Sequence, residues 1–198
     1  VPVPAKLGNG DDPANNLYWG ALYGVKGFLS RSKNWVLVSH KKNATGNILE
    51  ELVLKHKSSN KFMEVRAYRG AAIKRAIQDF FKAFDKKDKT RIVVYVGHNG
   101  LMDFRLNEPS QKAESDKTAI VLCCKSKQYF APYLSRVGVK RALLTTNFMA
   151  PEAYVLDAAL RSLLLDSSIE TSQRCAALAY SRYQKCGKRA ANRLFTTI

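Results

Sequence analysis

The chain has 198 residues and a mass of 22.2 kDa, with 46% hydrophobic and 25% charged residues. These proportions are those of an ordinary globular protein, and no apolar run reaches the roughly 18 residues that would span a bilayer. The net charge of +17 predicts attraction to polyanions such as nucleic acid, anionic membranes or cell-wall polymers.

The first 13 residues differ in composition from the rest. Residues 1–13 ("VPVPAKLGNGDDP") are rich in proline, glycine and aspartate, which predicts an extended lead-in. Residues 14–198 are expected to form a single domain, because a chain of this length can bury a sizeable core. The first residue is not methionine. We therefore expect a trimmed chain or the product of signal-peptide removal, so a cytoplasmic and an exported location both fit the sequence.

Periodic apolar residues predict alternating strands and helices along the chain. Segment 71–84 ("AAIKRAIQDFFKAF") is the clearest amphipathic helix, and segment 91–97 ("RIVVYVG") is the clearest buried strand. Further helices are expected at 14–32, 127–138, 150–165 and 169–195. Further strands are expected at 34–39, 61–68, 118–124 and 140–148, with a polar loop at 98–117. Residues 47–57 fit a helix or a strand, and the alternation of Leu52 and Leu54 favours a strand. This order predicts an α/β fold, a three-layer sandwich with a largely parallel central sheet.

Three consecutive predicted strands end in polar or reactive side chains. His98 follows the first strand between Gly97 and Gly100, Cys124 ends the second, and residues 145–147 end the third. Because functional sites of open parallel sheets lie beyond the carboxyl ends of the strands, these groups are expected to share one edge. Glycines beside His98 allow a sharp turn and the close approach of a ligand.

An imidazole and a thiol at one edge predict nucleophilic catalysis by a Cys/His dyad. The reactive form of cysteine is the thiolate, which an imidazolium or the adjacent Lys125 would stabilise. Asp103 is a candidate to orient His98 or to bind a substrate cation, and it is equally suited to a helix cap or a loop ion pair. Further candidate supporting or pocket residues are Gly97, Asn99, Gly100, Ser126, Thr145, Thr146 and Asn147. Ser126 also fits the role of a helix cap.

Two strings, "IVVYVGHNG" and "TAIVLCCKS", resemble the paired strand ends of caspase-like cysteine peptidases, a group that includes caspases, legumains, gingipains and clostripain-like enzymes. The resemblance covers residues 91–148. It implies a caspase-like fold, a peptide or protein substrate and no cofactor or metal, with His98 as the base and Cys124 as the nucleophile. It also implies that Gly100 stands near the backbone that binds the oxyanion. The sequence departs from the group because Asn99 separates His98 from Gly100. Strings such as "GHNGLMDF" and "MAPEAYVLDAAL" also resemble an uncharacterised bacterial family.

Other interpretations of these residues stay open. Cysteine in a buried strand is usually a small core residue, and Cys123 is expected to be one. The dyad also fits a relative that has lost activity, and His98 could instead act on water without any thiol. A non-enzymatic module that binds an anionic polymer is the alternative from another class. Its cationic residues would be Arg174, Arg182, Lys185, Lys188, Arg189 and Arg193. No cysteine or histidine spacing indicates a metal site, so four free thiols are expected.

Overall fold

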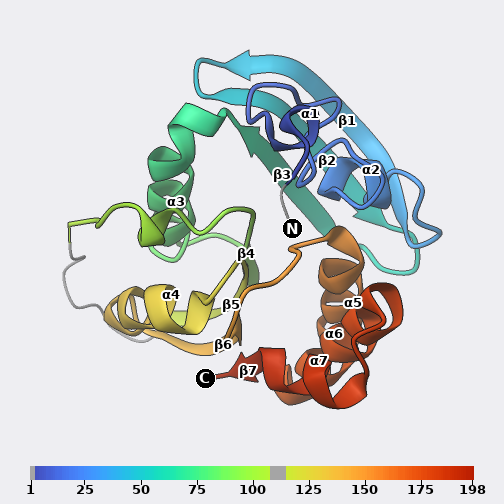
Figure 1. Ribbon diagram of the computed structural model, residues 1–198, viewed down its shortest axis with the longest axis vertical. Coiled ribbons are helices and arrows are strands. Elements are labelled where there is room, and N and C mark those ends of the chain that lie inside the picture. Colours follow the sequence, from blue (N-terminus) through green and yellow to red (C-terminus); the bar gives the residue numbers. More distant parts are fainter. Residues whose placement is uncertain (1–2, 108–114) are drawn as a thin grey trace. The chain divides into compact units, whose positions relative to one another are not determined.

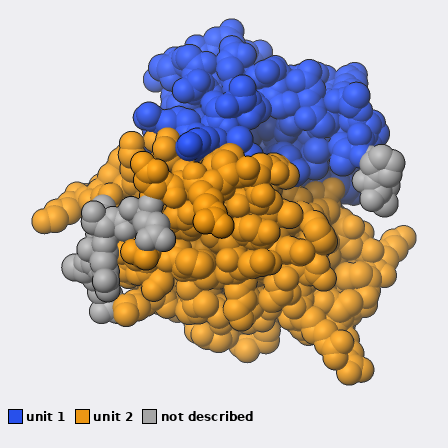
Figure 2. Space-filling view, turned by 60° about the vertical axis from the view of Figure 1, so that its left-hand side comes forward, with its two compact units in different colours: residues 1–76 blue, residues 77–198 orange. Residues whose placement is uncertain are grey.

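The computed structural model describes residues 3–107 and 115–198 as two compact units, unit 1 (1–76) and unit 2 (77–198). Figure 2 shows the two units in separate colours, and each is described below by itself. The single domain expected for residues 14–198 spans both units and stays a prediction. The expected lead-in contains a short helix, α1 (Ala5–Gly8). Residues 1–2 of that lead-in and 108–114 of the expected polar loop lie outside the described residues.

Unit 1 is built on an antiparallel sheet of three strands in the order β1-β2-β3, as labelled in Figure 1. The strands are β1 (Trp35–Thr45), β2 (Ile48–His56) and β3 (Phe62–Tyr68). In β2 the side chains of Leu52 and Leu54 are buried, and this alternation is the pattern that predicted a strand at 47–57. The turn between β1 and β2 contains Gly46.

The helix expected over residues 14–32 is wrong for most of that segment. Only α2 (Val25–Leu29) is helical there, and residues 13–24 form turns. Gly24 is one reason, since a Cβ at this position would lie 2.5 Å from the Trp19 backbone. Both the turns and α2 are held to β2 by Glu50, which accepts hydrogen bonds from Trp19 Nε1 at 2.5 Å and from Lys26 Nζ of α2 at 2.7 Å. Burial opposes ionisation of Glu50, but these two donors outweigh it and lower the pKa of the carboxyl.

Unit 2 contains a four-stranded sheet in the order β4-β5-β6-β7. Its strands are β4 (Ile92–Val96), β5 (Ser115–Leu122), β6 (Val139–Thr145) and β7 (Phe195–Thr197). The pairs β4–β5 and β5–β6 are parallel, whereas β7 pairs antiparallel with β6. The predicted mixed α/β fold with a mostly parallel sheet is confirmed. Residues 119–122 of β5 are fully buried, as expected for a central parallel strand.

Five α-helices accompany this sheet in the described part of the chain. They are α3 (Ile73–Lys82), which contains the boundary between the units, α4 (Ser126–Arg136), α5 (Ala153–Leu164), α6 (Ile169–Gln184) and α7 (Lys188–Leu194). Two 3-10 helices, η1 (Gly70–Ala72) and η2 (Gly100–Met102), are also present. α4 packs against β5 and β6, and α6 packs against β6 and β7. An aromatic cluster joins α3 to α4, where the rings of Phe81 and Phe130 stack at 5.8 Å.

The helix expected over residues 169–195 is divided into α6 and α7. Lys185 and Gly187 both have positive φ angles, 52° and 81°. Residues in this region cannot continue a right-handed helix. The chain therefore turns between α6 and α7 and then adds β7 to the edge of the sheet. No described helix is both long and apolar enough to cross a membrane.

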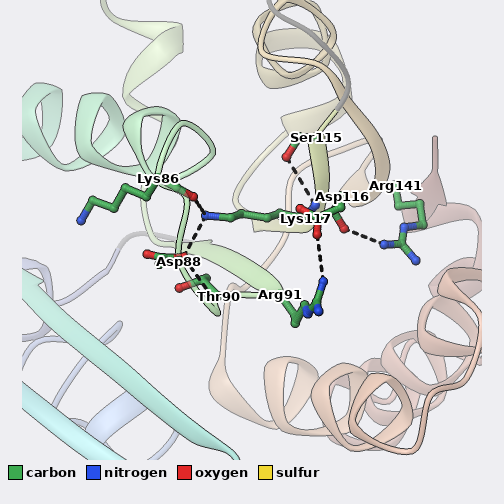
Figure 3. A network of polar contacts seen from close by, with 8 residues as sticks. All are labelled: Lys86, Asp88, Thr90, Arg91, Ser115, Asp116, Lys117 and Arg141. Atoms are coloured by element: carbon green, nitrogen blue, oxygen red, sulfur yellow. Dashed lines mark hydrogen bonds and ion pairs between the residues drawn. The ribbon is translucent and has the colours of Figure 1, made fainter.

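A buried lysine fixes the amino end of β5 (Figure 3). Lys117 is only 3% exposed. Its ammonium group donates hydrogen bonds to Ala83 O at 2.8 Å, Lys86 O at 2.6 Å and Asp88 Oδ1 at 3.0 Å. The hydrogen bond from Lys117 is the largest cause that lowers the pKa of Asp88 to about 2. Because a buried charge is tolerated only when it is fully paired, this lysine ties β5 to the loop after α3.

Candidate active site

The carboxyl ends of β4 and β5 are joined at the edge predicted to hold the site. Val96 pairs with Leu122 in the parallel register, and Gly97 N donates to Leu122 O at 3.2 Å. Beyond this point the side chain of Asn99 donates from Nδ2 to the carbonyl oxygen of Cys124 at 2.6 Å. The loop that carries His98 is thus hydrogen-bonded to the turn that carries Cys124.

Asn99 is a buried connector rather than a pocket residue. It is 0% exposed, and its Oδ1 accepts a hydrogen bond from Leu101 N at 3.1 Å as the N-cap of η2. Because Nδ2 donates to Cys124 O, both polar atoms of the side chain are hydrogen-bonded within the protein. Its burial leaves it inaccessible to a ligand, so of the two expected roles, supporting residue or pocket residue, only the supporting one fits.

His98 is exposed and forms a close pair with Asp103. Nε2 of His98 lies 2.7 Å from Oδ2 of Asp103, and their side chains are 53% and 63% exposed. Two hydrogen bonds fix the His98 carbonyl, from Tyr95 OH at 2.7 Å and from Gly100 N at 3.1 Å. An exposed pair contributes little to stability. In this pair the carboxylate of Asp103 orients the imidazole through Nε2. Nδ1 is the ring nitrogen that could then accept or donate a proton.

Cys124 is half-buried in the turn between β5 and α4. Its Sγ donates to Met149 O at 3.6 Å and accepts from Met149 N at 3.5 Å. Among the described residues, the hydrogen bonds of this thiol thus go to the segment after β6, whereas those of the His98 ring go to Asp103. The neighbouring Cys123 is fully buried, and desolvation strongly raises the pKa of its thiol, as expected for a core cysteine.

Ser126 and Thr145 form a closed network between β5, α4 and β6. Both are 0% exposed. Ser126 Oγ donates to Val121 O at 2.9 Å and accepts from Thr145 N at 2.7 Å, while Thr145 Oγ1 donates to Cys123 O. Neither residue lines an accessible pocket, and Ser126 is unsuited to act as a nucleophile. The N-cap of α4 is Lys125 rather than Ser126, so that prediction is also wrong.

The remaining residues predicted to support or line the site lie beyond the carboxyl ends of β4, β5 and β6, and each forms contacts within the protein. Lys125 N donates to Asn147 O at 2.9 Å, and its Nζ lies 4.6 Å from the ring centroid of Phe148. Asn147 is exposed and accepts from Phe148 N, and Thr146 Oγ1 donates to Arg193 O at 2.7 Å. Gly97 is buried in the turn. The N–H of Gly100 donates to His98 O at 3.1 Å. That Gly100 stands near the backbone that binds an oxyanion, as the resemblance implies, stays a prediction.

The segment after β6 adds residues that sequence reasoning missed. Besides Met149 at the thiol, Ala150 N donates to Tyr180 OH at 3.2 Å. Burial raises the pKa of Tyr180, and the charges of Cys186, Glu152 and Cys124 add to the effect. Sites of parallel sheets lie beyond the carboxyl ends of strands, so a correct end for the third strand would have pointed to Met149 and Ala150. The sequence predicted that this strand runs to residue 148, whereas β6 ends at Thr145.

The six cations proposed for polyanion binding lie on α6, α7 and the turn between them. All are exposed. Residues 171–198 include these six and no aspartate or glutamate, so no carboxylate within this stretch neutralises them.

A hollow of about 360 Å³ occurs elsewhere, at the amino ends of β5 and β6. It is lined by Thr118, Lys140 and Arg141 with residues near the start of α6, and it includes none of the predicted site residues. In residues 3–107 and 115–198, no group of three or more His, Cys, Asp or Glu side chains is placed to hold a metal ion.

Comparisons of the chain with protein-family models, with curated proteins and with solved structures each found no match.

Proposed function

We propose that this protein is a cysteine-dependent hydrolase that transfers acyl groups as a caspase-like peptidase does, or an inactive relative of such an enzyme. The proposed fold is the three-layer sandwich of that group. The observation that carries the proposal is the hydrogen bond from Asn99 to the Cys124 carbonyl, because it joins the turn of the candidate nucleophile to the loop of the candidate base. The pairing of His98 with Asp103 supports the same assignment.

In the proposed mechanism, Cys124 attacks the carbonyl carbon of a peptide bond. His98 Nδ1 accepts the thiol proton, since Nε2 is engaged with Asp103, and later gives a proton to the departing amine. The resulting thioester is hydrolysed by water, which returns the thiol. During attack the sulfur leaves Met149 O, while the Met149 N–H is placed to hold the negatively charged sulfur. Asp103 acts as a positioning residue because it contacts only the imidazole.

The test is covalent labelling by a peptidyl acyloxymethyl ketone, a probe that alkylates active-site thiols. The modified residue is identified by mass spectrometry. We expect labelling at Cys124, loss of that label in Cys124→Ala, and a rate lower by about 10²-fold or more in His98→Ala. Cys186→Ala is the matched control because Cys186 is an exposed thiol in the turn between α6 and α7. Preferential labelling of Cys186, or equal labelling in His98→Ala, would refute the dyad. Hydrolysis that survives Cys124→Ala would instead favour His98 acting on water.

Polyanion binding is the second candidate function. It is favoured by the exposed lysines and arginines of residues 171–198, a stretch that contains no aspartate or glutamate. It is tested by the anisotropy of labelled single-stranded DNA over a salt series. Counterion release predicts a slope of log K against log salt of about −0.7 per phosphate contact. The triple variant of Lys188, Arg189 and Arg193 to alanine should flatten this slope by about 2 if those residues contact phosphates. Binding that is absent or independent of salt would exclude this function.

A further inference from the structure

The hollow of about 360 Å³ at the amino ends of β5 and β6, called the amino-end hollow below, combines cations with hydroxyl groups. It is lined by Thr118 of β5, Lys140 and Arg141 of β6, and residues that lead into α6. All of these belong to unit 2. Ligand pockets have volumes of about 300–1,000 Å³, so this hollow suits one small molecule or one end group of a larger molecule.

Thr118 is a buried polar residue whose hydroxyl has no partner among the residues that the structure describes. It is only 6% exposed, and it lines the amino-end hollow. The preceding Lys117 points to the opposite face of the sheet, where it binds the loop after α3. The alternation of side chains along a strand therefore directs Thr118 toward the hollow. Because buried hydroxyls are normally hydrogen-bonded, this one indicates a partner supplied from outside.

Arg141 stands beside Thr118 on the same face of the sheet. The two residues are partners in the parallel register of β5 and β6, and such partners project to one face. Arg141 Nη2 donates to the Asp116 carbonyl oxygen at 2.7 Å (Figure 3), whereas the Asp116 carboxylate pairs with Arg91 at 2.8 Å. In the described part of the chain, no carboxylate forms an ion pair with Arg141 or with the adjacent Lys140.

The amino end of α6 completes the lining of the amino-end hollow. This helix has 16 residues, and its N-cap Ser168 accepts a hydrogen bond from Thr171 N. The start of a helix attracts anions through its dipole and its free N–H groups. Glu170 also lines the hollow. Hydrogen bonds from its own N–H and from Ser168, with the charge of Arg174, lower the pKa of its carboxyl. Among the lining side chains, two cations thus face one carboxylate that is already engaged at the helix cap.

We propose that the amino-end hollow binds the phosphate group of a phosphate monoester. Arg141 and Lys140 supply the opposing charge, since a monoester phosphate carries close to two negative charges, whereas a carboxylate carries one. The planar guanidinium matches phosphate oxygens in pairs, and the Thr118 hydroxyl donates to another oxygen. Leu163 and Ile169 give the hollow an apolar side that suits the organic part of the ester.

This inference requires neither the hydrolase nor the polyanion proposal, because none of the binding residues of the amino-end hollow belongs to either. A phosphorylated metabolite and the 5′ end of a nucleic acid share the chemistry that the hollow recognises. The shared group is the terminal phosphate, and the test below separates its two sources.

The binding test compares AMP with adenosine, which lacks only the phosphate, by isothermal titration calorimetry. We expect AMP to bind at least about tenfold more tightly than adenosine. Thr118→Val removes the hydroxyl at nearly constant volume, and Arg141→Gln removes the charge. Each should weaken AMP binding by about tenfold or more, because hydrogen bonds to a charged group are strong. Thr118→Ser keeps the hydroxyl and should retain the native affinity. Arg105→Gln is the matched control, since Arg105 is an exposed arginine that follows η2.

Three results would overturn the site. They are equal affinities for AMP and adenosine, an AMP affinity that Thr118→Val and Arg141→Gln both leave unchanged, and no binding of either AMP or inorganic phosphate. Arg141 is exposed, so Arg141→Gln keeps the test decisive even if Thr118→Val unfolds the protein.

The source of the phosphate is identified with hexathymidylate that carries either a 5′ phosphate or a 5′ hydroxyl. Tighter binding of the phosphorylated form, lost in Arg141→Gln, supports the site and assigns it to a nucleic-acid end. Equal binding of the two oligonucleotides, with AMP still bound, supports the site and assigns it to a small molecule.

Discussion

Replacing Asn99 by alanine tests the connection between the two strand ends. The substitution removes two hydrogen bonds and leaves Leu101 N–H and Cys124 O without their partner. Leu101 is only 6% exposed, so its N–H bears the full desolvation cost, whereas the half-buried turn at Cys124 is partly hydrated. At about 1–3 kcal/mol for a buried orphan group, with a smaller cost for the hydrated one, Asn99→Ala should lower the free energy of unfolding by about 2–4 kcal/mol.

Asn99→Asp gives a sharper contrast because it changes only the group that faces Cys124. The new carboxyl still accepts from Leu101 N but sets an oxygen against the Cys124 carbonyl, and burial without a cation raises its pKa above the unfolded value of about 3.9. A raised pKa means that stability is fully present below pH of about 4 and is lost as pH rises through the folded pKa. The variant should therefore approach the native protein in acid and fall below it at neutral pH.

Urea unfolding and thermal melts of both variants measure these effects. A loss of 2–4 kcal/mol corresponds to about 6–12 °C in Tm for a protein of this size. Asn192→Ala is the control, since Asn192 is exposed on α7 and should change the free energy of unfolding by less than about 0.5 kcal/mol. If Asn99→Ala differed from the native protein by no more than this control, the hydrogen bonds of Asn99 would not hold the edge together.

Other residues of unit 2 give further predictions. Lys117→Met removes the main cause of the low pKa of Asp88, which is about 2 in the folded protein against 3.8 ordinarily. The stability contributed by this carboxyl is full above pH of about 4 and is lost as pH falls toward 2, so urea midpoints between pH 2 and 5 should depend less on pH in the variant. An unchanged pH dependence would contradict the assignment. In native protein, a thiol reagent should modify exposed Cys186 quickly and buried Cys123 only after unfolding; equal rates would be inconsistent with this burial. Ser126→Ala should cost about 1–3 kcal/mol in urea unfolding and leave labelling of the site thiol detectable, whereas loss of label in a folded variant would return Ser126 to the catalytic candidates.

The parts of the fold that sequence predicts best are those where burial on both faces leaves a continuous apolar run. β4 and β5 coincide with such runs within a few residues. The segment around Trp19 fails because its helical apolar spacing is overridden by close backbone contacts at Gly24, which are tertiary and invisible to periodicity. The division between α6 and α7 has a local signal in Gly187, which the continuous helical pattern on both sides outweighed.

For the site, chain order alone predicts that successive parallel strands place their carboxyl ends at one edge of the sheet, and His98 and Cys124 lie at two such ends. Chain order does not predict which polar side chains form hydrogen bonds inside the protein and are therefore inaccessible to a ligand. Asn99 and Thr145 are such residues, because each bridges two strand ends and is buried in doing so. The orientation of Glu152 depends on Gln184 from a distant helix, a pairing that spacing along the sequence cannot indicate.

The short strand β7 has a consequence for how the chain is made. Leu143 and Thr145 of β6 pair with Thr197 and Phe195, and three helices separate these partners in the chain. On the ribosome, the outer border of β6 therefore emerges long before the segment that covers it. During that interval it offers unpaired backbone groups to any neighbouring nascent strand. Chaperone protection during synthesis would matter most in this window.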